Sequence, residues 1–462
     1  MSTSNSSVDV STVSSSIAAP LPKRGGSATP ARSEGAIGKS LALLQPLGGS
    51  YAWLVWTIAT VFVVYLFSFQ TGYAIVNPSV QKDVSLSVAQ VAEIAAVYTW
   101  VFAVCQFFGG ALLDRLGAHK VTTTAIALVT IGIFLFANAT SYQMLLLSQV
   151  ILATGSCVGF VGAGYVGGQW FGMAKFSAMF GLVQFVASVT SAFTQNLIDF
   201  TLKHTDWRSM FNWSAAFGVV LFVLSLVYVR NPTPIVSDSK GGVGGFFSGV
   251  VHNLVEVGKV PHVWVTGVVG AALFGAMLSL GVVWAPKLLA AHGINTQVAD
   301  LGASLLWLGL ATGSIIVIRW SDHIRRRKLP IILGALAQLL TLGALLYLSH
   351  IGPAFALTMC FLFGFANAAH MLTFSSAADV VKPAQIGTSA AIVNGLMFIA
   401  GGLMIDAPGA RIGVAQHAGR TGLAVAQFAG LPVLIALLAA LVIALFMKET
   451  YPAAEQSAET SR

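Results

Sequence analysis

The sequence predicts an all-α polytopic membrane protein with twelve transmembrane helices. Only 9% of its 462 residues are charged, against about 25% in ordinary soluble domains, and the mean hydropathy is +0.82. A soluble surface with so few charges would expose larger apolar patches than monomers tolerate. From Trp53 onward, apolar stretches of about 20 residues recur, each long enough to cross a hydrocarbon core of about 30 Å.

These stretches are expected to be helices, because backbone polar groups in lipid must be satisfied within the segment. They are also too long and too uniformly apolar for barrel strands. The twelve predicted spans are residues 53–77, 89–113, 121–140, 144–168, 177–199, 209–229, 263–286, 299–318, 330–349, 353–376, 386–405 and 424–447.

The chain before the first span is rich in serine and then in proline, glycine and alanine. Residues 1–50 contain no apolar core followed by a small-residue cleavage site, so a cleaved secretory signal is not expected. We predict that this segment is a disordered cytoplasmic tail and that the first span acts as the insertion signal.

The basic residues predict the orientation of the spans. If both termini are cytoplasmic, eighteen of the 24 Lys and Arg residues fall on the cytoplasmic side, as the positive-inside rule requires. The sequence therefore predicts a multi-pass integral protein of the bacterial inner (plasma) membrane.

Two halves of similar length flank the longest internal polar connection, residues 231–261, which is expected to be an unstructured cytoplasmic loop. Residues 51–230 and 262–447 would then form two pseudo-symmetric six-helix bundles, and residues 448–462 a cytoplasmic tail. Polar residues recur at matching places in the two halves, notably Gln184 and Asn394.

The connection after the second span carries a motif, Gly-Ala-Leu-Leu-Asp-Arg-Leu-Gly-Ala-His-Lys at residues 110–120. It resembles the loop signature G-x-L-x-D-R-x-G-x-[RK] of the major facilitator superfamily. A degenerate second copy, an acidic residue followed by bases, occurs after the eighth span. The residues that match the motif or its second copy are Gly110, Asp114, Arg115, Gly117, Lys120, Asp322 and Arg326.

This resemblance implies two bundles that rock about a central cavity and give alternating access. The motif would then be a cytoplasmic latch, in which the Asp114 carboxylate contacts bases or a helix N-terminus of the other half and is released as that side opens. The alternative is that a short cytoplasmic loop simply carries charge. The glycine spacing and the second copy argue against that alternative.

Some family features are missing. Ile151 stands where many proton-coupled members carry an arginine, and the fifth span contains no proline. The overall pattern is loosely similar to the oxalate and monocarboxylate-type branch, but residues 299–318 and 386–405 contain no basic residue. A dicarboxylate substrate is therefore disfavoured.

Ionisable residues inside the membrane are expensive, so the few that are present are candidates for ion coupling. His370 lies well inside the tenth span, and its charge can change near neutral pH. Glu93, about one turn inside the second span, is the competing candidate. The alternatives are a neutral histidine bonded to a neighbouring helix and a carboxylate at the membrane interface.

Uncharged polar and aromatic side chains near the midpoints of the spans suit a small polar organic solute. Interhelical hydrogen bonds, each worth under about 2 kcal/mol, are the alternative for every one of them. The predicted substrate-binding residues are Phe69, Gln70, Tyr73, Tyr98, Gln184, Trp307, Asn367, His370 and Asn394.

The sequence shows no phosphate-binding loop, metal-ligand spacing, nucleic-acid-binding basic stripe or catalytic constellation, so no cofactor, metal, nucleic acid or enzymatic activity is expected. We predict a monomeric secondary active transporter that moves a metabolite or monocarboxylate-like solute, with proton-coupled uptake. An exporter of the same fold and a non-transporting membrane sensor are the alternatives.

Overall fold

The computed structural model describes residues 47–232 and 242–452, and this part of the chain is helical without strands. Most of the predicted N-terminal tail, residues 1–46, lies outside the described residues, as do residues 453–462. The first half contains α2 (Ser50–Asp83), α3 (Val88–Ala137), α4 (Tyr142–Ser156), α5 (Gly159–Phe171), the 3-10 turn η1 (Met173–Lys175), α6 (Phe176–Leu202) and α7 (Trp207–Tyr228).

The central connection contains one helix, α8 (Gly242–Gly258). The second half of the chain then contains α9 (Pro261–Leu278), η2 (Ser279–Trp284), α10 (Ala285–Ala291), α11 (Thr296–Ile324), α12 (Lys328–Tyr347), α13 (Pro353–Asn367), η3 (Ala368–His370), α14 (Met371–Ala378), η4 (Pro383–Gln385), α15 (Ile386–His417) and α16 (Leu423–Phe446).

The described residues contain 11 helical stretches that are long and apolar enough to cross a membrane. One of them, Ala89–Ala137, has 49 residues and would be about 74 Å long, more than twice the thickness of the hydrocarbon core. Within it, Gly117 has φ 76° and ψ 167°, a conformation that glycine adopts without steric cost. The stretch is therefore two spans joined at Gly117, and the all-α fold of about twelve spanning helices is confirmed.

Three predicted spans are interrupted. The fourth breaks between α4 and α5 at Cys157 and Val158, the seventh contains the π-helical η2, and the tenth contains the 3-10 turn η3. Hydropathy does not reveal these breaks, because Cys157, Val158 and most of η2 are apolar, and the few polar residues near η3 do not interrupt the apolar stretch. Interrupted spans are typical of transporters, where they place backbone groups near binding sites.

The prediction that residues 231–261 are an unstructured loop is wrong for residues 242–258, which form α8. The apolar residues Val250, Leu254 and Val257 recur at helical spacing, and Val250 and Val257 are buried. They form the side of α8 that packs against α3, α9 and α15. The glycines suggested a flexible loop, but this apolar stripe stabilises a helix.

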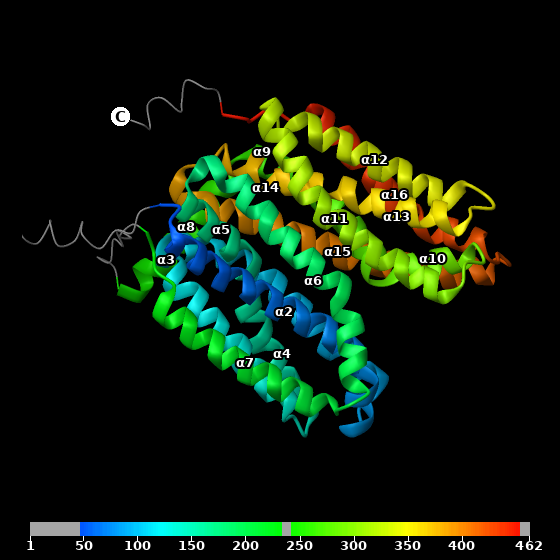
Figure 1. The fold of residues 1–462 in the computed structure, drawn as a ribbon, viewed down its shortest axis with the longest axis horizontal. Coiled ribbons are helices and arrows are strands. Elements are labelled where there is room, and N and C mark those ends of the chain that lie inside the picture. Colours follow the sequence, from blue (N-terminus) through cyan, green and yellow to red (C-terminus); the bar gives the residue numbers. More distant parts are fainter. Residues whose placement is uncertain (1–46, 233–241, 453–462) are drawn as a thin grey trace, which may run out of the picture. The chain divides into compact units, whose positions relative to one another are not determined.

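The two halves meet through equivalent helix pairs. The second span, in α3, packs against α15, and α6 packs against α11, as Figure 1 shows for α6 and α11. In the predicted duplication α3 corresponds to α11 and α6 to α15, so the two contacts are related by the internal pseudo-symmetry. This pairing places the motif after the second span beside the start of α15.

A glycine pair lets α3 and α15 cross closely. A Cβ atom added at Gly110 would collide with the carbonyl oxygen of Gly387 and with Ala391. A Cβ atom added at Gly387 would lie 2.8 Å from the carbonyl oxygen of Gly110 and 2.7 Å from Oδ1 of Asp114. The first glycine of the motif is therefore required by this backbone contact between the halves.

We predict that Gly110→Ala lowers the thermal unfolding midpoint of the purified protein, because overpacking of a tight contact costs about 1–3 kcal/mol. Gly402→Ala on α15 is the matched control, since an added Cβ there meets no atom within 4 Å. The control should leave the midpoint unchanged or raise it, because alanine favours a helix by up to about 1 kcal/mol over glycine. Equal midpoints for the two variants would contradict the close crossing.

Candidate functional site

The Asp114 carboxylate binds the first turn of α15 in the other half. Its Oδ1 accepts a hydrogen bond from the Gly387 backbone N–H (2.9 Å), and its Oδ2 accepts bonds from the Thr388 N–H (2.8 Å) and hydroxyl (2.7 Å). The first N–H groups of a helix have no partner within the helix and carry the positive end of its dipole. The sequence analysis expected this carboxylate to contact either basic side chains or a helix N-terminus of the other half, and the structure shows the helix N-terminus.

Two other motif residues lie around this contact. The Arg115 guanidinium occupies the space beside Gly249 of α8 where a Cβ atom would otherwise lie. Lys120 is exposed, after the break at Gly117. Because α8 also contacts α15, the helix that connects the halves packs next to the Asp114 contact.

Further contacts join the halves at the same end. The Ser177 and Ser375 hydroxyls, on α6 and α14, are hydrogen-bonded at 2.8 Å. The Phe374 ring stacks on Phe180 (centroids 5.0 Å apart) and also approaches Phe160 (5.9 Å). Phe180 and Phe374 are almost completely buried, so the halves are packed together at this end, which we call the Asp114 end.

The second copy of the motif makes a different contact. Oδ1 of Asp322 pairs with Nη1 of Arg327 (2.6 Å), within the same half, and Nε of Arg327 lies 3.7 Å from Asp379. The Arg326 side chain, predicted to belong to the latch, is exposed, and its backbone carbonyl accepts a hydrogen bond from Ser321. The guanidinium that pairs with the acidic residue is thus that of Arg327.

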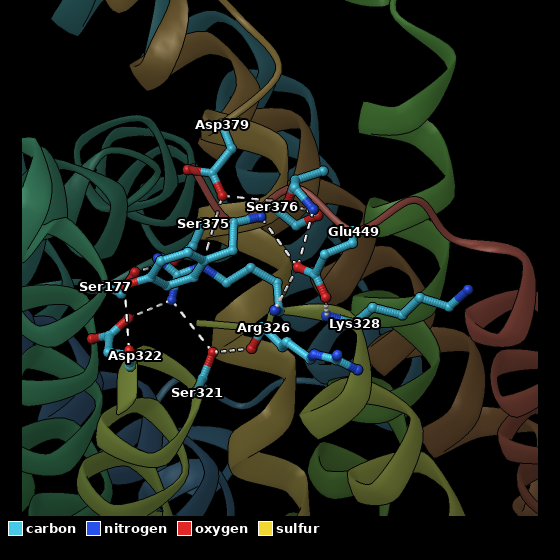
Figure 2. Close-up of polar contacts among 12 residues, drawn as sticks. Ser177, Ser321, Asp322, Arg326, Lys328, Ser375, Ser376, Asp379 and Glu449 are labelled. Atoms are coloured by element: carbon cyan, nitrogen blue, oxygen red, sulfur yellow. Dashed lines mark hydrogen bonds and ion pairs between the residues drawn. The ribbon is translucent and has the colours of Figure 1, made fainter. Parts of the chain in front are cut away.

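The chain just after α16 completes this cluster, and Figure 2 shows Glu449 directed toward it. The Glu449 carboxylate accepts hydrogen bonds from the N–H groups of Arg327 (2.7 Å) and Lys328 (3.2 Å), at the start of α12. The Thr450 hydroxyl lies within hydrogen-bond distance of Ser376 Oγ and Asp379 Oδ2. We call Asp322, Arg327, Asp379 and Glu449 the tail cluster.

Sequence reasoning missed most of the tail cluster. Asp379 directly follows the tenth span, and Glu449 follows the twelfth, in the segment predicted only to be a cytoplasmic tail. A carboxylate directly after a span, like Asp114, was the signal that could have been used. Burial raises the pKa of Asp379 to about 6, although the neighbouring Arg327 favours its ionised form.

Between the halves, aromatic rings form a continuous row from α3 to η3. The Tyr98 hydroxyl accepts a hydrogen bond from Gln70 (2.7 Å), and its ring is stacked near Phe102. The row then passes from Phe102 to Phe398 (4.8 Å), to Phe274 (6.0 Å) and to His370 (4.7 Å). The structure therefore brings the predicted residues Gln70, Tyr98 and His370 into one chain of contacts that spans both halves.

Buried amides accompany this row. Gln184 donates to Ser188 (2.8 Å), while Asn394 is 3% exposed and makes no side-chain hydrogen bond with any described residue. Gln106, which the sequence analysis did not select, is 1% exposed and both its amide atoms lack a partner in the described part of the chain. It packs near Gly395, the residue after Asn394. Unpaired buried amides are costly and therefore suggest a missing partner.

His370 and Asn367 lie at the break in the tenth span. Nδ1 of His370 bonds to the Asn367 carbonyl oxygen (2.7 Å), and the Asn367 amide donates to the carbonyl of Leu273 (2.6 Å). Nε2 of His370 has no hydrogen-bond partner among residues 47–232 and 242–452. Within the described part of the chain, the Oδ1 of Asn367 and the Oε1 of Gln338 are buried without a partner, and sequence reasoning also missed Gln338.

Other predicted site residues are placed elsewhere. Phe69 and Tyr73 pack against Phe136 inside the first bundle, where Phe69 (4% exposed) belongs to the core and Tyr73 is partly buried against it. Trp307 is buried and donates to the Gly281 carbonyl in η2 (3.3 Å). Glu93 is exposed near the start of α3. Adjacent residues of one helix point to different sides, and only the packing decides which side faces the other half.

The sequence model of one protein family, the Major Facilitator Superfamily, matches residues 47–405 of this chain. The chain belongs to this superfamily. A solved structure, the proton:xylose symporter XylE bound to 6-bromo-6-deoxy-D-glucose, shares the fold with a TM-score of 0.61. The alignment covers 87% of this chain and 97% of that one, at 17% identity. The predicted family membership is therefore confirmed.

Two bacterial proteins are also similar in sequence to this chain. The uncharacterized transporter YybO of Bacillus subtilis (strain 168) is 20% identical over 298 residues, which are 61% of this chain and 68% of that protein. The riboflavin transporter RibZ of Clostridioides difficile (strain 630) is 26% identical over 84 residues, or 18% of each chain. This Major Facilitator Superfamily protein is thus a transporter by family, and its substrate is a separate question.

We predict that Asp114→Asn opens the Asp114 end, because an amide NH2 opposes the N–H donors of α15 and the charge on the helix dipole is lost. Such an interaction is worth up to about 2 kcal/mol, which corresponds to roughly a thirtyfold shift in the equilibrium. A cysteine at buried Ser389, in a background without the three native cysteines, should then react faster with a polar thiol reagent. Asp300→Asn, at an exposed residue, is the control, and an unchanged labelling rate in Asp114→Asn would contradict the latch.

The tail cluster predicts a pH dependence of stability. Since the pKa of Asp379 rises from 3.8 to about 6 on folding, the folded protein holds a proton that the unfolded chain has released in this pH window. Stability should therefore fall as the pH rises through the window, and Asp379→Asn should abolish this contribution. The measurement is the unfolding midpoint against pH for both proteins.

Asp206 provides a comparison of opposite sign, since hydrogen bonds from the Ser209 backbone and side chain lower its pKa. Its contribution to stability should appear as the pH rises and be lost in acid. If the midpoints of the wild type and Asp379→Asn run parallel between pH 3.8 and about 6, the raised pKa of Asp379 is refuted.

Proposed function

We propose that this protein is a monomeric secondary active transporter that takes up a small polar organic solute by alternating access, coupled to protons. The observation that carries the proposal is the Asp114 contact. A carboxylate on one half and a helix N-terminus on the other are joined by hydrogen bonds, which can break and form again as the halves part and close. The state described is closed at the Asp114 end, which the distribution of basic residues assigns to the cytoplasm.

The groups between the halves support a metabolite or monocarboxylate-like substrate. Gln70, Tyr98, Gln106, Gln184 and Asn394 supply neutral donors and acceptors, and the neighbouring rings supply flat apolar surface. Such a combination suits a small solute with a few polar groups and an apolar or planar body. The unpaired amide of Gln106 is the group whose free energy improves most when a substrate bonds to it.

His370 supports proton coupling. It is the end of the aromatic row, its Nδ1 is fixed by the Asn367 carbonyl, and its Nε2 is without a partner in the described chain. A proton added at Nε2 would place one positive charge at the break in the tenth span. Such a change biases the equilibrium between two states if they solvate the charge differently.

Transport is tested by counterflow in proteoliposomes. A thermal-shift screen of the purified protein against a metabolite library first selects a compound that raises the unfolding midpoint. Vesicles loaded with that compound should then accumulate its labelled form transiently, because exchange requires the binding site to face each side in turn. Binding without counterflow would contradict transport and favour the sensor function.

We predict that His370→Gln retains counterflow, which needs no net proton movement, but loses accumulation against a concentration gradient when a pH gradient is imposed. Glutamine keeps hydrogen-bonding capacity without a titratable nitrogen. His417→Gln, at an exposed histidine in the last turn of α15, is the control and should accumulate substrate as the wild type does. Gradient-driven accumulation by His370→Gln at the wild-type level would reassign the coupling role.

A further inference from the structure

A cavity of about 140 Å³ lies inside the second half, away from the groups described above. It is lined by residues of η2, α10, α12, α15 and α16 and is partly open. Since α15 begins at the Asp114 contact, the lining residue Ile412 near its end places the cavity toward the opposite end of the bundle. At one end its lining is exposed, at Lys287 and Gly422, and at the other it is buried, at Leu280 and Val433.

The length of the cavity suits the part of a lipid chain that crosses one leaflet, and its volume holds about six carbons of that chain. From Gly422 to Val433 the lining follows α16 for about 15 Å, which is half of a hydrocarbon core of about 30 Å. The lining is mostly apolar, so water is a poor occupant. An apolar cavity of about 150 Å³ is known to stay dry and to bind a ring of six carbons. The α16 helix has exposed apolar residues on another side, such as Ile435 and Leu438, so the surrounding lipid lies next to the cavity.

One basic side chain, Lys287, lines the exposed end, and two more, Arg411 and Arg420, lie within two residues of the lining residues Ile412 and Gly422. The Lys287 ammonium lies 4.4 Å from the centroid of the Trp284 ring. The guanidinium groups of Arg411 and Arg420 lie over the Phe428 ring, at 3.8 and 4.6 Å from its centroid. Across residues 47–232 and 242–452, none of these three cations forms a salt bridge with a carboxylate. The mouth of an apolar cavity thus carries positive charge that no acidic side chain neutralises.

We propose that this cavity binds an acyl chain of an anionic phospholipid, with the phosphate held by Lys287 and Arg420. The charge at the mouth favours an anion, and the apolar interior favours a chain attached to it. A depth of one leaflet places the phosphate at the level of the headgroups. The lipid fills the space between α10, α12, α15 and α16 and stabilises the packing of α16.

Lipid binding is measured on the purified full-length protein by native mass spectrometry with phosphatidylglycerol and, for comparison, zwitterionic phosphatidylcholine. The wild type should retain phosphatidylglycerol selectively. Lys287→Gln combined with Arg420→Gln should weaken its binding roughly thirtyfold, from the loss of two charges. Lys203→Gln, at an exposed lysine in the other half, is the control and should bind as the wild type does.

The acyl chain is tested separately. Ala429→Phe fills the cavity and should abolish binding of phosphatidylglycerol, whereas Ala439→Phe on an exposed side of α16 should not. Glycerol phosphate, the headgroup without chains, should not displace the bound lipid. Undiminished selectivity in the double variant, or undiminished binding in Ala429→Phe, would overturn the proposal. Neither readout requires transport, so the result is independent of the proposed function.

Discussion

The hydrogen bonds between the Asp114 carboxylate and the first turn of α15 are the interaction on which the described arrangement of the two halves depends. A carboxylate at this depth must have partners, and here all its donors come from the other half. They are accessible only because Gly110 and Gly387 let the two backbones approach. The stacking of Phe180 on Phe374 and the bond between Ser177 and Ser375 then close the same end. Each of these contacts is individually weak enough to break reversibly, which a transporter requires.

The tail cluster gives the second half an internal counterpart of this contact. Glu449 accepts from the N–H groups at the start of α12 much as Asp114 accepts from those at the start of α15. The difference is that Glu449 and α12 belong to the same half, so this contact fixes a bundle rather than closing a passage. The pseudo-symmetry of the fold is broken at the motif, because Asp114 bonds to the other half whereas its counterpart Asp322 pairs with Arg327 of its own half. Asp114 joins the halves, and Glu449 holds the end of the chain to its own bundle.

The sequence predicted the parts of this structure that depend on composition and local spacing. The spans follow from apolar length, and the contact of Asp114 with a helix N-terminus of the other half was among the partners predicted from a motif whose glycines and acidic residue are close in sequence. The tail cluster was missed because Arg327 and Glu449 are distant in sequence and meet only after α12 and α16 have packed. Packing also decides the different positions of Phe69 and Gln70, which are neighbours in α2. Phe69 enters the core of the bundle, whereas Gln70 bonds to Tyr98. The breaks at Cys157 and His370 do not shorten the apolar stretches in which they lie, so locating them also required the folded structure.

The central claim is that the halves part at the Asp114 end while they close at the other. Pulsed electron spin resonance tests it most directly, with nitroxide pairs at exposed positions on opposite halves. One pair, at Lys120 and Lys382, reports on the Asp114 end, and a second, at Lys203 and Lys287, on the far end. In lipid vesicles each pair should show two distance populations, and Asp114→Asn should lengthen the first distance while it shortens the second. A single distance at both ends, or distances that lengthen together, would contradict alternating access.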